Sequence, residues 1–170
     1  MKNDYEIRGE TTVIFVSHKG KALEVLVDTE DLPKLQEIPY KWCVRYKPQT
    51  NTYYAMANYY EKRKYIQLHR FLTNAEDGLV VDHINHNTLD NRKKNLRVIT
   101  NGQNLQNRRG ATSLSSSGIR GVSWRKDINK WRARVNVNGK EYNVGVFDKQ
   151  EDAEKAVVNA RKKLMPYATA

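Results

Sequence analysis

A serine- and glycine-rich break divides this chain and limits what it can fold into. Residues 108–118 read RRGATSLSSSG and have no hydrophobic period. Stretches of this composition form flexible linkers, so a single hydrophobic core cannot extend across them. We therefore expect two modules, residues 1–108 and 118–170, joined by a linker over residues 109–117. Each module must bury its own small core.

The composition is typical of a soluble globular chain, with 39% hydrophobic and 29% charged residues. No run approaches the roughly 18 apolar residues of a membrane span. The first ten residues lack the apolar core of a signal peptide, so we expect a cytoplasmic protein with no membrane partner. The single cysteine, Cys43, excludes an internal disulfide and a cysteine-based zinc finger.

The basic charge is unevenly distributed along the chain. There are 30 Lys and Arg against 19 Asp and Glu, a net charge of +11. Residues 1–50 contain 8 basic and 8 acidic groups, residues 51–110 contain 10 and 5, and residues 111–170 contain 12 and 6. Basic charge can simply maintain solubility, but its segregation favours a polyanionic partner met by the last two thirds of the chain.

The upstream module has the alternation of short strands. A hairpin is predicted around Lys19-Gly20-Lys21, followed by a short helix and a second strand pair. The expected elements are strands Thr11–Ser17 and Ala22–Val27, a helix over Asp31–Gln36, and strands Tyr40–Tyr46 and Thr52–Tyr60. Seven of the ten tyrosines lie between Tyr40 and Tyr65. We favour the packed face of a sheet for them over a platform that stacks bases.

Residues 79–107 contain a carboxylate, an imidazole and several amides, the side-chain types that can bind a metal ion or transfer a proton. The short apolar strand Leu79-Val80-Val81 presents Asp82 and His83 at its end. A second strand, Leu96–Ile99, follows a polar loop, and Thr100-Asn101-Gly102-Gln103 fits the pattern that starts a helix. This order of strand, loop, strand and helix is expected to bring Asp82 close to Asn104.

These side chains suit a hard cation and a proton acceptor. Mg²⁺ takes few protein ligands, usually one carboxylate with neutral oxygens, waters and substrate phosphate, and Asp82 with Asn104 would supply them. His83 lies on the other side of the strand from Asp82 and is available to take a proton from water. Asn101 or Asn107 could replace Asn104. A zinc site of His83 and His86 with Cys43 or His69 is a weaker alternative, and His69 could simply be a core residue.

At these residues the sequence resembles the HNH endonucleases of the phage and intron-encoded homing branch. The resemblance covers about residues 65–108 and rests on Asp82-His83, on the N-x-x-D-N-R-x-x-N-L-R pattern from Asn87 to Arg97, and on T-x-x-x-N from Thr100 to Asn104. It also includes Leu68-His69-Arg70. The resemblance implies a ββα-metal nuclease fold, with His83 as general base, Asn95 orienting the loop and imidazole, and Asp82 binding the metal. The second metal position, usually histidine, is Asn104 here.

The downstream module has a different pattern, which predicts three strands and one helix. Asn138-Gly139 is a strong hairpin signal. The strands are expected at Gly118–Arg125, Lys130–Val137 and Lys140–Phe147, with a helix from Asp148 that ends before Pro166. The apolar stripe of the helix should cover one face of the sheet. The exposed face would then carry Arg120, Arg125, Arg132 and Arg134.

This segment resembles the plant ethylene-response-factor (Apetala-type) DNA-binding domain. The similarity rests on I-R-G-V-S-W-R at Ile119–Arg125, on W-R-A-R-V, and on V-G-V-F-D before the helix. It implies base-reading positions at Arg120, Arg125, Arg134 and Asn136, with Arg132 on the same cationic face. Ser123, Glu141 and Asn143 depart from the family pattern, so the target sequence does not carry over. A basic sheet without sequence preference is the alternative.

Taken together, the sequence predicts an α+β protein that is a metal-dependent, site-preferring DNA endonuclease. We expect a homing enzyme of a phage, intron or other mobile element that acts as a monomer on double-stranded DNA with Mg²⁺, or Mn²⁺, as cofactor. A noncatalytic DNA-binding regulator is the main alternative. An RNA-binding or RNA-processing protein is a third possibility, favoured by the tyrosines alone.

Overall fold

The computed structural model describes residues 1–59, 64–108, 110–111 and 115–168, with the side chain of Lys64 left out. The chain is α+β, as predicted, with small antiparallel sheets and short helices. It divides into two compact units, residues 1–100 and 101–170. The linker over residues 109–117 stays a prediction, since it lies partly outside the described residues.

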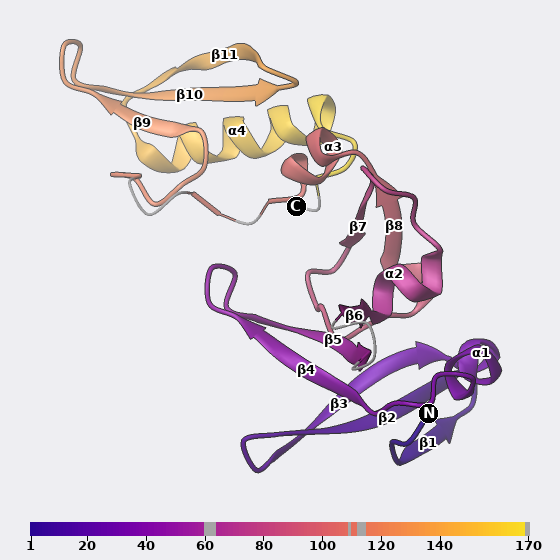
Figure 1. Ribbon diagram of the computed structural model, residues 1–170. Coiled ribbons are helices and arrows are strands. Elements are labelled where there is room, and N and C mark those ends of the chain that lie inside the picture. Colours follow the sequence, from indigo (N-terminus) through magenta and orange to yellow (C-terminus); the bar gives the residue numbers. More distant parts are fainter. Residues whose placement is uncertain (60–63, 109, 112–114, 169–170) are drawn as a thin grey trace. The chain divides into compact units, whose positions relative to one another are not determined.

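The first unit begins with a three-stranded sheet in the order β1-β2-β3 (Figure 1). Its strands are β1 (Tyr5–Arg8), β2 (Thr11–His18) and β3 (Lys21–Asp28). The 3₁₀ helix η1 (Thr29–Asp31) and helix α1 (Leu32–Gln36) follow. The predicted hairpin and short helix are confirmed. β1 was not predicted, because its alternation of apolar and charged residues extends over only four positions, all of them exposed.

A second sheet, in the order β4-β5-β6, has two different faces. It consists of β4 (Trp42–Lys47), β5 (Thr52–Tyr59) and β6 (Lys64–Gln67). Trp42 and Val44 are buried in the core shared with β2 and β3, whereas Arg45 and Lys47 are exposed on the opposite face. The tyrosines are divided as well: Tyr53 packs against the core, and Tyr65 is 51% exposed. Tyr60, the predicted end of β5, lies outside the described residues.

The first unit ends with a helix and a two-stranded sheet. They are α2 (Leu68–Thr73), β7 (Val80–His83), the 3₁₀ helix η3 (Lys93–Asn95) and β8 (Leu96–Ile99). β7 and β8 pair antiparallel, as predicted, but β7 continues through His83. Asp82 and His83 are therefore strand residues and do not lie beyond the strand end. α2 buries Leu68 and Leu72 in the core, and Arg70 donates hydrogen bonds to the carbonyls of residues 75, 76 and 79.

The second unit contains a short helix and a sheet covered by a longer helix. These are α3 (Asn101–Gln106), β9 (Val122–Arg125), β10 (Lys130–Val137), β11 (Lys140–Phe147) and α4 (Gln150–Leu164). The sheet order is β11-β10-β9, and Ala153 and Val157 of α4 pack on Ala133 and Val135 of β10. The predicted three strands and covering helix are confirmed.

Two predicted boundaries in this unit are wrong. β9 begins at Val122 and not at Gly118, because Gly121 has φ +87° and turns the chain toward β10. A Cβ atom at Gly121 would lie 2.3 Å from the carbonyl oxygen of Arg134, so only glycine fits this close approach. α4 begins at Gln150, two residues after Asp148. No helix among the described residues has the length and apolar character to cross a membrane.

Candidate active site

His83, the last residue of β7, lies in a cluster of three rings, in which both histidines are buried and Tyr54 is partly exposed. Its side chain packs edge-on against His69 of α2, with ring centroids 5.3 Å apart. Tyr54 of β5 contacts both imidazoles, at 5.8 Å from His69 and 6.2 Å from His83. His83 is 4% exposed and His69 is 6% exposed. We call His69, His83 and Tyr54 the histidine cluster.

The surroundings of His83 favour a neutral imidazole. Burial lowers its pKa, while the hydrogen bond to Asn91 and the charges of Asp82 and Asp90 act in the opposite direction. The His83 Nε2 atom lies 3.4 Å from the Asn91 side-chain oxygen. Because an amide oxygen only accepts, this bond requires the hydrogen on Nε2 and leaves Nδ1 as the basic nitrogen. A neutral imidazole with one free basic nitrogen is what a general base requires.

His69 is held neutral more strongly. Burial, together with the positive charges around it, lowers the pKa of His69 to about 3. Its Nδ1 atom is buried and has no hydrogen-bond partner among the described residues. His69 is thus a buried residue, as the alternative of a core histidine predicts. It is also a direct neighbour of His83.

Asp82 lies on the other side of β7 from His83 and contacts Arg97. Asp82 and Arg97 are directly opposite each other in the register of β7 and β8. Arg97 Nε donates to Asp82 Oδ2 at 2.8 Å, and the Arg97 NH2 atom lies 2.7 Å from the same oxygen. The Asp82 side chain is 10% exposed. No role was predicted for Arg97, although it belongs to the N-L-R part of the motif and lies directly across the hairpin from Asp82.

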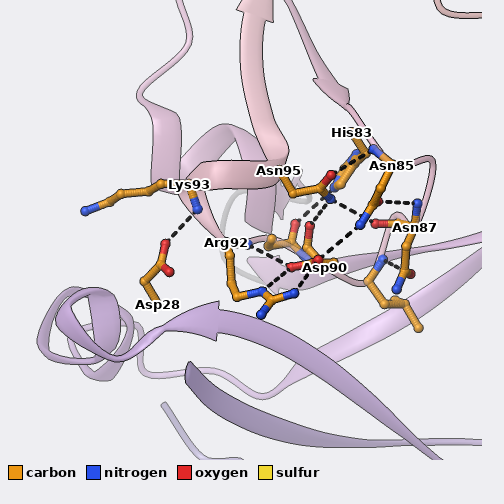
Figure 2. Close-up of polar contacts among 10 residues, drawn as sticks. Asp28, His83, Asn85, Asn87, Asp90, Arg92, Lys93 and Asn95 are labelled. Atoms are coloured by element: carbon orange, nitrogen blue, oxygen red, sulfur yellow. Dashed lines mark hydrogen bonds and ion pairs between the residues drawn. The ribbon is translucent and has the colours of Figure 1, made fainter. Parts of the chain in front are cut away.

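Asn95 organises the loop between β7 and β8. Its side-chain oxygen accepts from the backbone N–H of Asn85 at 2.9 Å, and its Nδ2 donates to the carbonyl of Asp90 at 2.7 Å (Figure 2). Its own carbonyl accepts from the backbone N–H of Ile84 at 2.9 Å. Asn95 is 4% exposed, so these bonds stand in for water that cannot reach it. The loop thereby takes one conformation around His83.

Asp90 and Arg92 form the second bracing contact of this loop. Arg92 Nε and NH2 each donate to one carboxylate oxygen of Asp90, both at 2.7 Å (Figure 2). This bidentate geometry is the strong form of an Arg–carboxylate pair, and it lowers the pKa of Asp90 against the opposing effect of burial. Asn85 adds a third bond to Asp90, at 3.2 Å.

The loop is also attached to the N-terminal strands. Leu26 of β3 donates to the carbonyl of Leu89 at 2.8 Å and accepts from the backbone N–H of Asn91 at 2.7 Å. The backbone N–H of Lys93 donates to Asp28 at 2.6 Å (Figure 2), and the Thr88 hydroxyl donates to the Tyr53 carbonyl. The N-terminal strands therefore position Asn91, the residue that contacts His83.

The predicted metal ligands, Asp82 and Asn104, are a carboxylate and a neutral amide. No group of three or more His, Cys, Asp or Glu able to hold a metal exists among the residues the structure describes, which leaves the zinc alternative without support. A carboxylate such as Asp82, with a neutral amide oxygen and substrate phosphate, is the donor set that Mg²⁺ accepts. Asn104 is half-buried in α3, which belongs to the second unit, so its pairing with Asp82 stays a prediction.

The predicted DNA-reading residues of the second unit are engaged to different degrees. Arg134 is ion-paired with Glu141 at 2.7 Å, and Arg125 is paired with Asp127. Asn136 is exposed on β10, and the Nε of Arg132 is buried without a partner among the described atoms. Arg120 departs from its predicted place on the exposed sheet. It precedes β9, and its guanidinium donates to the carbonyls of Leu105, Gln106 and Arg108 at 2.8 to 3.1 Å.

Comparisons with known proteins agree with the chemistry of the first unit. Residues 73–106 match the family model described as HNH endonuclease. Protein 3.8 of Escherichia phage T7 is 36% identical over 66 residues, which is 39% of this chain and 54% of that protein. An uncharacterized HNH endonuclease of Acanthamoeba polyphaga mimivirus is 36% identical over 94 residues, which is 52% of this chain and 47% of that protein. No solved structure matches.

These matches support a nuclease. The family-model match covers Asp82, His83, Asn95 and Asn104. The chain spans about half the length of the curated relatives it matches. Sequence reasoning did not identify Asn91 or Tyr54 as neighbours of His83. Asn91 lies inside the D-N-R part of the motif, which was a usable signal, whereas nothing local to Tyr54 distinguishes it from the other tyrosines.

Proposed function

We propose that this chain is a metal-dependent DNA endonuclease that hydrolyses phosphodiester bonds in duplex DNA. One observation carries the proposal: Asp82 and His83 are consecutive, buried and on opposite sides of β7, inside the segment that matches HNH endonucleases. Asp82 can therefore bind a metal ion on one side of the strand while His83 accepts a proton on the other. A ββα-metal arrangement of β7, β8 and α3 belongs to the same proposal.

In this reaction His83 Nδ1 takes a proton from the water that attacks phosphorus. Burial keeps His83 unprotonated at neutral pH, and the Asn91 oxygen fixes the orientation of the imidazole. Asn95 acts as a positioning residue, because it holds the loop that contains Asn91. Asp82 and Asn104 would hold Mg²⁺ or Mn²⁺, which when bound stabilises negative charge on the phosphate and the departing 3′ oxygen.

The second unit would hold the enzyme on its target. Its basic sheet and covering helix have the order of an Apetala-type domain, and Arg132, Arg134, Arg125 and Asn136 are its candidate DNA contacts, with Arg120 acting from the segment before β9. This arrangement supports site preference. The phage and giant-virus relatives support a homing role in a mobile element. We propose that the protein acts as a monomer.

Incubation with supercoiled plasmid tests the proposal. Purified wild-type protein and a His83→Ala variant are each incubated with plasmid in Mg²⁺, in Mn²⁺ and in EDTA, and the products are separated on agarose. Nicked or linear DNA should form only with wild-type protein and a divalent metal. Plasmid that is retarded but stays supercoiled with both metals would contradict the proposal and favour the noncatalytic DNA-binding regulator.

A further inference from the structure

One stretch of the first unit has an uncompensated positive charge. Residues 38–59 contain Lys41, Arg45 and Lys47 and not one Asp or Glu, whereas all eight acidic groups of the first 50 residues precede residue 38. The zero net charge of residues 1–50 is therefore the sum of an acidic segment, residues 1–37, and a basic one, residues 38–50. This segment is the hairpin of β4 and β5 (Figure 1).

The two cations of β4 lie on the same face of the sheet as the histidine cluster. Arg45 is directly opposite Tyr54 in the register of β4 and β5. The Lys47 ammonium lies 5.2 Å from the centroid of the Tyr54 ring. Since the Tyr54 ring packs against His83, the exposed Lys47 is linked to the proposed general base through a single ring, and Arg45 lies beside that ring in the register. We call Arg45 and Lys47 the β4 cation pair.

Neighbouring cations near the site are already neutralised, and these two are not. Arg97 is paired with Asp82, Arg92 with Asp90, and Lys93 with Glu30. Arg45 and Lys47 are exposed and make no ion pair within the part of the chain that the structure describes. Their charge is therefore available to an external anion. Of the two, Lys47 also contacts an aromatic ring, that of Tyr54.

We propose that the β4 cation pair binds backbone phosphates of the DNA strand that is cut, next to the scissile bond. The inference rests on the proposed function and adds a substrate contact to it. Arginine binds phosphate through two hydrogen bonds, whereas lysine acts as a point charge. Arg45 would therefore fix the position of the DNA strand, and Lys47 would screen the charge of its phosphates close to His83. The contact also extends DNA binding into the first 50 residues, which the charge totals alone had set aside.

Salt-dependent binding tests the contact independently of cleavage. A fluorescent duplex is titrated in EDTA at several salt concentrations with wild-type protein, with the Arg45→Gln, Lys47→Gln double variant, and with a Lys2→Gln, Lys21→Gln control. The control lysines are likewise exposed and make no ion pair with any residue that the structure describes, so both double variants lose the same charge. The slope of log K against log salt should become about two units shallower in the β4 variant only, since each phosphate contact contributes about 0.9. Equal slopes in the two variants would overturn the proposal.

A second measurement locates the contact on the DNA. Once the cleavage site is mapped, methylphosphonate groups replace single phosphates at successive positions around it, and binding in EDTA is repeated. A neutral phosphate beside the scissile bond should weaken wild-type binding by about tenfold and leave the β4 variant unchanged. An equal loss in both proteins would overturn the placement. If plasmid is never cut, the proposed endonuclease fails, while the salt slope still decides whether β4 binds DNA.

Discussion

Asp82 and Arg97 face each other across the β7–β8 hairpin, and the guanidinium contacts one carboxylate oxygen through two nitrogens, at 2.8 and 2.7 Å. The carboxylate is largely buried, and a buried carboxylate without a partner is costly. In the absence of metal, Arg97 therefore supplies the positive charge that a divalent ion would supply when bound.

This relationship predicts competition between Arg97 and the metal. Arg97→Gln should lower the Mg²⁺ concentration that gives half-maximal cleavage by several-fold and should reduce the stability of the metal-free protein. Both effects arise because the variant leaves Asp82 without its cation. Asp82→Asn should need far more Mg²⁺. Metal titrations of cleavage and urea unfolding in EDTA measure the two effects, and a raised Mg²⁺ requirement in Arg97→Gln would contradict the idea.

His83→Ala should separate catalysis from binding. A general base contributes roughly 10² to 10⁴ to the rate and little to ground-state affinity, so cleavage should fall by that factor while duplex affinity stays within about twofold. Cleavage assays and gel shifts on the same preparations provide the comparison. Wild-type turnover in the variant would remove His83 from the mechanism.

Asn95→Ala should act through the loop. The substitution removes a buried hydrogen bond to Asp90 and a partly buried one from Asn85, and should lower the free energy of unfolding by about 1 to 3 kcal/mol. Cleavage should decline because Asn91 is no longer held beside His83. Asn95→Asp keeps the acceptor for the Asn85 N–H but turns a buried, unpaired carboxylate toward the Asp90 carbonyl, so its loss of stability in urea should be larger than that of Asn95→Ala. A smaller loss in Asn95→Asp would contradict this account of the Asn95 contacts.

The Asn104 prediction concerns the second metal ligand. Its amide oxygen is a neutral, hard donor, so Asn104→Ala should cleave slowly and need several-fold more Mg²⁺, whereas Asn104→His should regain activity. Asn101, exposed in the same helix, offers a matched alanine control that should behave like wild type. An unchanged metal requirement in Asn104→Ala would place the ligand elsewhere.

His69 should make stability depend on pH. Its folded pKa of about 3 lies below the ordinary 6.5, so the unfolded chain takes up this proton first as the pH falls. Stability from the neutral imidazole is therefore complete above about pH 6.5 and is lost progressively toward about pH 3, with about 2 kcal/mol gone by about pH 5. His69→Gln should remove this part of the decline. Urea unfolding of both proteins at about pH 7 and about pH 5 measures the difference, and parallel declines would argue against it.

Local patterns predicted much of this fold because its hairpins depend on residues close in sequence. Asn138 and Gly139 both have positive φ at the turn between β10 and β11, as the turn signal requires. The apolar stripe of α4 likewise predicted the covering helix, which buries Ala153 and Val157. α2 was not predicted, because its buried Leu68 and Leu72 form only one i, i+4 apolar pair and no helix-starting pattern precedes them.

The candidate site was predictable only in part, for a related reason. Asp82 and His83 directly follow the apolar residues Leu79-Val80-Val81 in the sequence, so their neighbouring positions on opposite faces could be inferred from strand alternation. The contact of His83 with Tyr54 could not, because it joins residues far apart in sequence that share no register. The same holds for the hydrogen bond between Leu26 and Asn91. It joins two segments that are distant in sequence, so no hydrophobic periodicity could predict it.

The bonds between Leu26 and the loop have a kinetic consequence. A loop amide with only local partners exchanges its hydrogen with solvent through small fluctuations, but the Asn91 amide is tied to a carbonyl of β3. Its hydrogen exchange should therefore follow the opening of the N-terminal sheet, at the same protection factor as the amide of Leu26. The loop beside His83 and the sheet at the start of the chain would then open and close as one cooperative folding unit.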